Sequence, residues 1–245
     1  MKPSSSFMKS PDQIEVLFEN EDFLVLDKPS GWIVNESGTT TTQPVVQEWL
    51  KQNLKYPISE SREMRSGVVH RLDKETSGIL LVAKNEKTFT WLQSQFKERK
   101  VHKKYLALAH GEMEGEGVIN APVGRLPWRR DRFGVFPGGR EAETKYLVKK
   151  VYERDGEKYS LVELEPKTGR THQIRIHLKY LGHPIVADDF YAGRKTARKE
   201  RLWCPRLFLH ASEIDFTTET GEEVHFVSEL ASDLDQVLKQ LTALV

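Results

Sequence analysis

Hydrophobic and polar positions along the 245-residue chain fall into short segments that predict a mixture of strands and helices. Segments that are apolar throughout, or apolar at every second position, predict strands, whereas apolar residues three or four positions apart predict helices. We expect a hairpin of two strands over 14–27 and further strands at 67–70, 79–83, 104–109, 145–153, 159–164, 206–214 and 224–226. Helices are expected over 45–54, 85–99, 171–181 and 230–244.

Local signals refine these elements and indicate the fold class. Asn85 and Thr171 are residue types that cap helix N-termini, and Gly182 is placed to end the second of these helices. The glycine-rich stretch 111–142 predicts hairpins and long loops. Because the strands are not regularly followed by crossover helices, we expect an α+β fold with a mixed, largely antiparallel sheet and flanking helices.

Composition is that of a globular protein, with 38% hydrophobic and 30% charged residues. No apolar run approaches the roughly 18 residues that a membrane helix needs, and the first residues lack the apolar core of a signal peptide. Cys204 is the only cysteine, which excludes a disulfide framework and a cysteine-based metal cluster. We therefore expect a cytoplasmic protein, with a flexible tail over 1–13 and a single domain over 14–245.

The net charge is only +1, but the charges are unevenly distributed. Lysine and arginine concentrate in 97–104, 125–132 and 194–206, whereas 211–236 contains acidic residues and no lysine or arginine. A chain polarised in this way can present a basic face to phosphate groups while its net charge stays near zero. The alternative interpretation of each run is an ordinary solvated surface.

The segment 70–84 places a charged group next to a buried strand. Asp73 lies between Arg71 and Lys74 and precedes the continuous apolar run 79–83. Nearby positive charge favours the ionised carboxylate, which is the form required for nucleophilic work. Taken alone, however, an aspartate beside arginine and lysine is more often a surface ion pair.

This segment resembles the aspartate-bearing motif of the RluA-type pseudouridine synthases, enzymes that isomerise uridine in RNA. Four further segments resemble motifs of that family in the same order along the chain. They are 14–29, Lys103-Lys104-Tyr105 followed by Gly111, Thr168 to His177, and Gly182-His183-Pro184-Ile185 followed by Leu207 to Ala211. Five ordered matches are far more specific than any one short motif.

The resemblance implies the pseudouridine synthase fold, in which a bent antiparallel sheet carries an RNA cleft, and an isomerase that needs no cofactor and no metal. It implies that Asp73 is catalytic and that Tyr105 stacks on a flipped uracil. It also implies that an arginine of the segment Thr168 to His177 pairs with Asp73. We expect Arg170 to be this arginine, because it precedes a predicted helix N-terminus, and Arg175 is the alternative one helical turn further on.

The expected partner is RNA, either transfer or ribosomal RNA, bound by a monomer that lacks the small RNA-binding module some relatives carry before the catalytic domain. Arg71 is expected to fill the space that the flipped base leaves or to bind a neighbouring phosphate, and His70 either to contact RNA or to orient the loop. The full set of expected RNA-binding residues is His70, Arg71, Lys74, Thr76, Lys103, Arg130 and Arg175.

Two other functions compete with this interpretation. One is a catalytically silent RNA-binding protein on the same scaffold. The other is a glycosidase-like hydrolase, which needs a second carboxylate roughly 5–10 Å from Asp73, for which Glu75 and Asp188 are the candidates. His172 and His177 lie five positions apart and so on different helix faces, which disfavours zinc, and Asp188-Asp189 is expected to brace a turn.

Overall fold

The computed structural model describes residues 13–36 and 43–244. Residues 1–12 of the expected N-terminal tail therefore lie outside the described part. The helices are α1 (Val46–Asn53), α2 (Glu86–Lys97), α3 (Gln173–Tyr180), α4 (Arg194–Glu200), α5 (Ser232–Lys239) and the 3-10 turn η1 (Arg65–Gly67). The strands are β1 (Glu15–Glu19), β2 (Phe23–Lys28), β3 (Ser77–Ala83), β4 (His102–His110), β5 (Glu116–Asn120), β6 (Val123–Leu126), β7 (Arg129–Val135), β8 (Glu143–Arg154), β9 (Glu157–Pro166), β10 (Leu209–Thr217), β11 (Glu223–Val227) and β12 (Thr242–Ala243).

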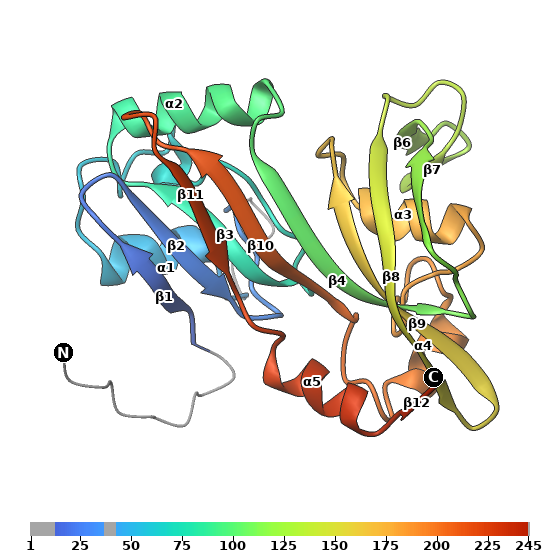
Figure 1. Ribbon diagram of the computed structural model, residues 1–245. Helices are drawn as coiled ribbons and strands as arrows, with labels where there is room; N and C mark the ends of the chain where they lie inside the picture. The colour runs from blue at the N-terminus through green and yellow to red at the C-terminus, as the bar shows by residue number, and fades with distance from the viewer. Residues whose placement is uncertain (1–12, 37–42, 245) are drawn as a thin grey trace.

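One large sheet forms the body of the molecule and bends between two halves (Figure 1). Its strands follow the order β1-β2-β3-β10-β4-β9-β8-β12, with β11 beside β10 and β5 beside β8. Among these pairs only β3 and β10 run parallel, so the predicted mixed, largely antiparallel sheet is confirmed. Strand β4 joins the half that carries β1, β2, β3, β10 and β11 to the half that carries β9, β8 and β5.

The hydrophobic pattern placed most elements correctly because it follows burial directly. Every residue of β3 is buried between β2 and β10, which is why its sequence from Ile79 to Ala83 is apolar throughout rather than alternating. Helix α2 begins where predicted, and the side chain of Asn85 caps it by accepting a hydrogen bond from the backbone N–H of Thr88 at 2.9 Å. No helix in the described ranges is long and apolar enough to cross a membrane.

Three expectations about elements are wrong, each for a local reason, and one helix was missed. The predicted strand 67–70 is a 3-10 turn and an isolated bridge, because Arg65, Ser66 and Gly67 all adopt positive φ. Helix α3 is preceded by a left-handed His172 without a side-chain cap, so Thr171 is not its N-cap. The C-terminal helix ends at Lys239, because the chain then adds the short strand β12 to β8. Helix α4 was not predicted at all.

A glycine determines how closely the loop after Asp73 approaches β10. Gly78 has φ +107°, and a Cβ there would lie 2.2 Å from the carbonyl oxygen of Ala211 on the parallel neighbour. Only glycine permits both this conformation and this approach. The start of β3 is therefore held directly against β10.

We expect Gly78→Ala to lower the free energy of unfolding by about 1–3 kcal/mol or more, because it combines a disfavoured φ with a backbone clash. Gly156→Ala is the matched control, since Gly156 also has positive φ but has open space around its Cβ position. Urea denaturation of both variants measures the difference, and equal losses would show that the approach to Ala211 contributes nothing.

Candidate functional site

A pocket opens beside β4 where the loop before β3 meets the loop between β9 and α3. Its volume is about 120 Å³, well above the roughly 10–15 Å³ that one water molecule requires. The structure brings most of the predicted site residues to this one pocket. Those that line it are Arg71, Asp73, Thr76, Lys103, Tyr105, Arg170 and Arg175.

Asp73 is held by Arg175, which comes from α3. The Nη1 group of Arg175 donates a hydrogen bond to Oδ2 of Asp73 at 3.1 Å. Its Nε and Nη2 groups donate to Oδ2 and Oδ1 of Asp188 at 2.7 and 2.8 Å. Asp188 is completely buried and Arg175 nearly so, whereas Asp73 keeps about a fifth of its side chain exposed at the pocket.

This geometry corrects the expectation that Arg170 is the ionic partner of Asp73. Arg170 lines the same pocket, but its Nε donates to the backbone carbonyl of Glu141 at 3.1 Å. Arg175 occupies the partner position because α3 places it over the pocket while Asp188 takes its other donors. The alternative considered from the sequence is therefore the arrangement found.

Asp188 also braces a turn, as expected. Its Oδ1 accepts hydrogen bonds from the backbone N–H groups of Phe190 at 2.9 Å and Tyr191 at 3.1 Å. The rings of these two residues lie 5.6 and 5.1 Å from the guanidinium of Arg175, within cation–π range. The sequence indicated the turn but gave no sign that the same carboxylate anchors Arg175.

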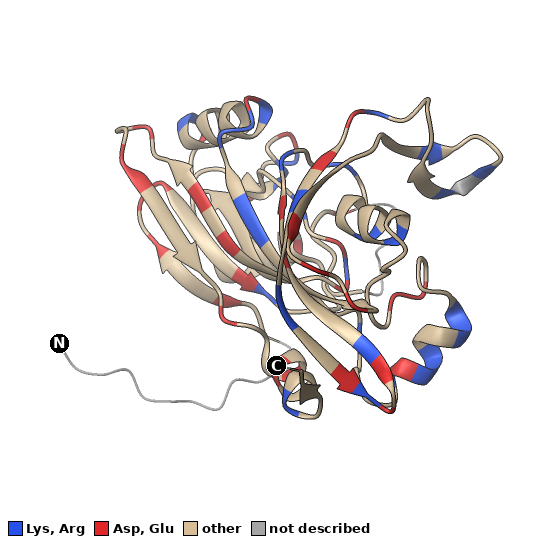
Figure 2. Cartoon of the chain, turned by 45° about the vertical axis from the view of Figure 1, so that its right-hand side comes forward, with Lys and Arg blue, Asp and Glu red and all other residues tan. Residues whose placement is uncertain are grey.

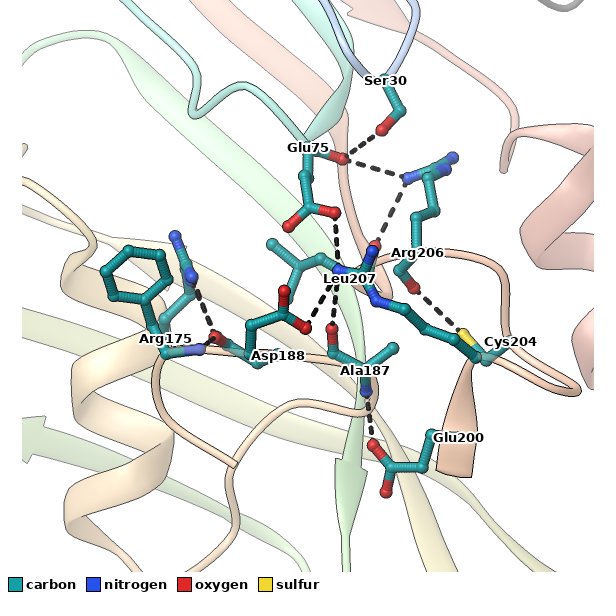
Figure 3. Close-up of polar contacts among 12 residues, drawn as sticks. Ser30, Glu75, Arg175, Ala187, Asp188, Glu200, Cys204, Arg206 and Leu207 are labelled. Atoms are coloured by element: carbon teal, nitrogen blue, oxygen red, sulfur yellow. Dashed lines mark hydrogen bonds and ion pairs between the residues drawn. The ribbon is translucent and has the colours of Figure 1, made fainter. Parts of the chain in front are cut away.

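The loop that carries Asp73 is held from behind through its carbonyl groups. The carbonyl of Lys74 accepts hydrogen bonds from Lys28 Nζ at 3.2 Å and from the backbone N–H of Gly31 at 2.8 Å. The carbonyl of Glu75 accepts from Ser30 Oγ at 2.8 Å and from Arg206 Nη1 at 3.3 Å (Figure 3). These contacts fix the backbone of the loop, so that the Asp73 side chain is presented to the pocket.

Lys28 is the most unusual of these partners, because its side chain is fully buried. Besides Lys74 it donates to the carbonyls of Pro29 at 2.8 Å and Trp32 at 3.1 Å. Burial, reinforced by the positive charge of Arg206, lowers the pKa of Lys28 to about 7. A buried lysine with three carbonyl acceptors was not singled out from the sequence, where it reads as a turn residue.

Tyr105 enters the pocket from β4, the strand that joins the two halves of the sheet. It is buried, and burial together with the nearby Asp73 raises the pKa of its hydroxyl above the usual range. The hydroxyl is therefore protonated near neutral pH. The aromatic ring and the carboxylate of Asp73 are presented to the same space.

Two of the expected RNA-binding residues, His70 and Lys74, do not line the pocket. His70 accepts a hydrogen bond from the backbone N–H of Leu81 at 2.9 Å and stacks on Phe96, and burial lowers its pKa to about 3. The structure therefore gives His70 the orienting role rather than a charged contact with RNA. Lys74 is exposed beside the pocket, and the side chain of Arg130 lies outside the described residues.

Sequence reasoning missed His172, which lies beside Asp73. Its Nε2 is 3.9 Å from Oδ2 of Asp73, and its Nδ1 is 2.9 Å from the hydroxyl of Tyr191. Burial lowers the pKa of His172, although Asp73 acts in the opposite direction. The backbone of His172 is left-handed, at φ +56°, a conformation that few residues other than glycine adopt. Such a conformation is a local structural sign of a functional site.

The hairpin of β6 and β7 lies beside α3 (Figure 1). Phe133 of β7 lies 6.1 Å from the ring of His172, and the guanidinium of Arg132 lies 4.7 Å from the ring of Phe190. One of the three basic runs is thus placed next to the site. Within the described ranges, no group of three or more His, Cys, Asp or Glu side chains is arranged to hold a metal ion.

The fold and pocket define an α+β protein whose site is a carboxylate held by a buried arginine where two halves of a bent sheet meet. The chain belongs to the RNA pseudouridylate synthase family, because the model of that family matches residues 22–180. A solved structure of human RNA pseudouridylate synthase domain containing 1 aligns with a TM-score of 0.75 and 28% identity, covering 100% of this chain and 92% of that one.

Curated relatives support the same family assignment. The chain is 38% identical over 217 residues to a protein of Chloroflexus aurantiacus described as an uncharacterized RNA pseudouridine synthase, covering 88% of this chain and 65% of the relative. It is 34% identical over 233 residues to ribosomal large subunit pseudouridine synthase D of Nitrosomonas europaea, covering 93% of this chain and 65% of the relative. The chain thus spans about two thirds of the length of these relatives.

We expect Asp188→Ala to lower the free energy of unfolding by about 3–5 kcal/mol, because it leaves the buried guanidinium of Arg175 without its main acceptor. Asp73→Ala is the matched control and should cost less than about 1 kcal/mol, since Asp73 is partly exposed and makes one contact with Arg175. Thermal or urea denaturation distinguishes them, and a larger loss for Asp73→Ala would contradict this division of roles.

The buried Lys28 predicts a pH-dependent stability. Its pKa is about 7 in the folded protein against 10.5 ordinarily, so between these values the unfolded chain binds more protons and stability rises with pH. Relative to Lys28→Met, the wild type should gain up to about 1.4 kcal/mol per pH unit above pH 7. Urea denaturation at several pH values tests this, and a constant difference between the two proteins would overturn it.

Proposed function

We propose that this protein is an RNA pseudouridine synthase, an isomerase that converts specific uridines of structured RNA to pseudouridine. Family membership supports this, and the observation that carries it is the placement of Asp73. A partly exposed carboxylate, held at 3.1 Å by a buried arginine and facing an aromatic ring, is suited to act on a nucleotide placed in the pocket.

The reaction breaks the bond between N1 of uracil and C1′ of ribose, turns the base, and joins C1′ to C5. The C5 hydrogen leaves as a proton and N1 gains one, so the product is an isomer and no electrons are exchanged. We propose that Asp73 is the nucleophile, that Arg175 holds its carboxylate, and that Tyr105 stacks on the uracil, an interaction worth roughly 1–3 kcal/mol.

The target uridine must leave its stack to reach this pocket. Arg71 is exposed at the rim and is proposed to bind the flanking phosphate or to occupy the vacated space. Lys103 also lines the pocket, and burial lowers its pKa to about 8, so it still carries its charge at neutral pH. Thr76 and Arg170 complete the proposed contacts with the nucleotide.

Ribosomal RNA is the proposed substrate class, because relatives with high similarity are named large-subunit pseudouridine synthases. Since those relatives come from bacteria, we place the reaction in the cytoplasm, with the protein acting as a monomer and without a cofactor. Transfer RNA is the alternative substrate, and both RNAs are compared in the experiment below.

A glycosidase-like hydrolase is disfavoured because both candidates for its second carboxylate are engaged by arginine side chains. Both oxygens of Asp188 are engaged by Arg175, and the side chain is completely buried. The carboxylate of Glu75 accepts a hydrogen bond from Arg201 at 2.8 Å. A silent RNA-binding protein has no use for a carboxylate in a pocket lined by arginine and lysine, because phosphate is repelled by it.

We expect Asp73→Asn to reduce pseudouridine formation by roughly a thousandfold or more while RNA affinity stays near that of wild type. Tritium release from transcripts labelled at uridine C5 measures the reaction, with ribosomal and transfer RNA transcripts compared in parallel.

Asp215→Asn is the matched control, since it makes the same chemical change at an exposed carboxylate on β10 that pairs with His225. It should release tritium at the wild-type rate. Full activity of Asp73→Asn would exclude the proposed mechanism. RNA binding without tritium release by the wild type on either RNA would favour the silent binder.

A further inference from the structure

Helix α4 carries a compact group of positive charges that the proposed reaction does not use. Arg194, Lys195, Arg198 and Lys199 are exposed, whereas Ala197 is buried and faces the protein. Residues four positions apart share a helix face, so the four cations form two adjacent rows, Arg194 with Arg198 and Lys195 with Lys199. Figure 2 shows this concentration of Lys and Arg on one side of the molecule.

No ion pair joins any of the four cations of α4 to a carboxylate of the described residues. Some exposed lysines elsewhere do have such partners, as Lys158 does in Glu112 and Lys239 in Asp235. Like charges at i and i+4 destabilise a helix, so this arrangement is one that an external polyanion would relieve.

The inner side of α4 is attached to the segment that carries Asp188 and, through Arg201, to the Asp73 loop. Glu200 is buried, accepts a hydrogen bond from the backbone N–H of Ala187 at 2.7 Å and lies 2.8 Å from Nε2 of His110 (Figure 3). Ala187 immediately precedes Asp188, the anchor of Arg175. The next residue after the helix, Arg201, donates to Glu75 in the Asp73 loop at 2.8 Å and lies 3.2 Å from Asp189.

We propose that the outer face of α4 is a second docking surface for the RNA substrate. This surface binds the phosphate backbone of the RNA beside the modified nucleotide. The surface is defined by Arg194, Lys195, Arg198 and Lys199. This inference rests on the proposed function. RNA is the partner that the geometry favours, because α4 is fastened to the Asp73 loop and to the turn that carries the anchor of Arg175. The pocket beside it is proposed to receive a nucleotide, and one continuous strand supplies phosphates to both.

The test compares two double variants that remove the same charge from different places. Arg194→Gln with Arg198→Gln removes one row of α4. Lys55→Gln with Arg62→Gln removes two exposed charges near α1, in the other half of the molecule. Binding to unmodified, in vitro transcribed large-subunit ribosomal RNA is measured by fluorescence anisotropy over a series of salt concentrations.

The α4 variant should bind RNA roughly tenfold more weakly at low salt, and the slope of log K against log salt should fall in magnitude by about 1.4–1.8. Tritium release should show the same loss as a raised KM rather than a lowered kcat. The control variant should bind and react as the wild type does. Circular dichroism checks folding, and Lys195→Gln with Lys199→Gln repeats the test on the second row.

An unchanged slope for both α4 variants would overturn the proposal, and so would equal losses for the α4 and control variants, which would indicate a general charge effect. If α4 instead binds an acidic protein, both α4 variants keep the RNA affinity and salt dependence of the wild type, which is the first of these outcomes. If the wild type binds RNA through α4 but releases no tritium, the docking surface stands and the proposed reaction fails.

Discussion

The buried guanidinium of Arg175 is the interaction on which the rest of the site depends. A charged group inside a protein is stable only when its donors are paired with good geometry, and Asp188 supplies two of the three acceptors. The third donor is left to hold Asp73 at the pocket. Two carboxylates around one arginine thus acquire different roles, since one is fully buried and the other is partly exposed.

The surrounding structure serves to keep this arrangement in place. Lys28, Ser30 and Arg206 hold the Asp73 loop by its carbonyl groups, so its side chain can face the pocket. On the other side, the turn after Asp188 is closed by hydrogen bonds that the backbone N–H groups of Phe190 and Tyr191 donate to the Asp188 carboxylate. Such support from hydrogen-bonded neighbours is what a reactive group requires to be presented in one geometry.

Much of the fold could be predicted from the sequence, because burial of β2, β3 and β4 leaves a direct trace in the apolar pattern. The motifs also predicted that Asp73 and Tyr105 act in one site, and both residues line the same pocket. The choice of Arg170 over Arg175 was wrong, because the pairing with Asp73 depends on Asp188, which approaches only through the tertiary fold. Helix α4 was missed for a related reason: it is short and mostly polar, and buries little beyond Ala197 and Glu200.

The contact between Asp73 and Arg175 joins residues 102 positions apart, one from each half of the bent sheet. Bringing together segments so distant in the chain carries the entropic cost of closing the long intervening loop. The pocket therefore does not exist in either half by itself. A complete site requires both half-sheets and the contact between them, so the integrity of the site reports on the integrity of the whole fold.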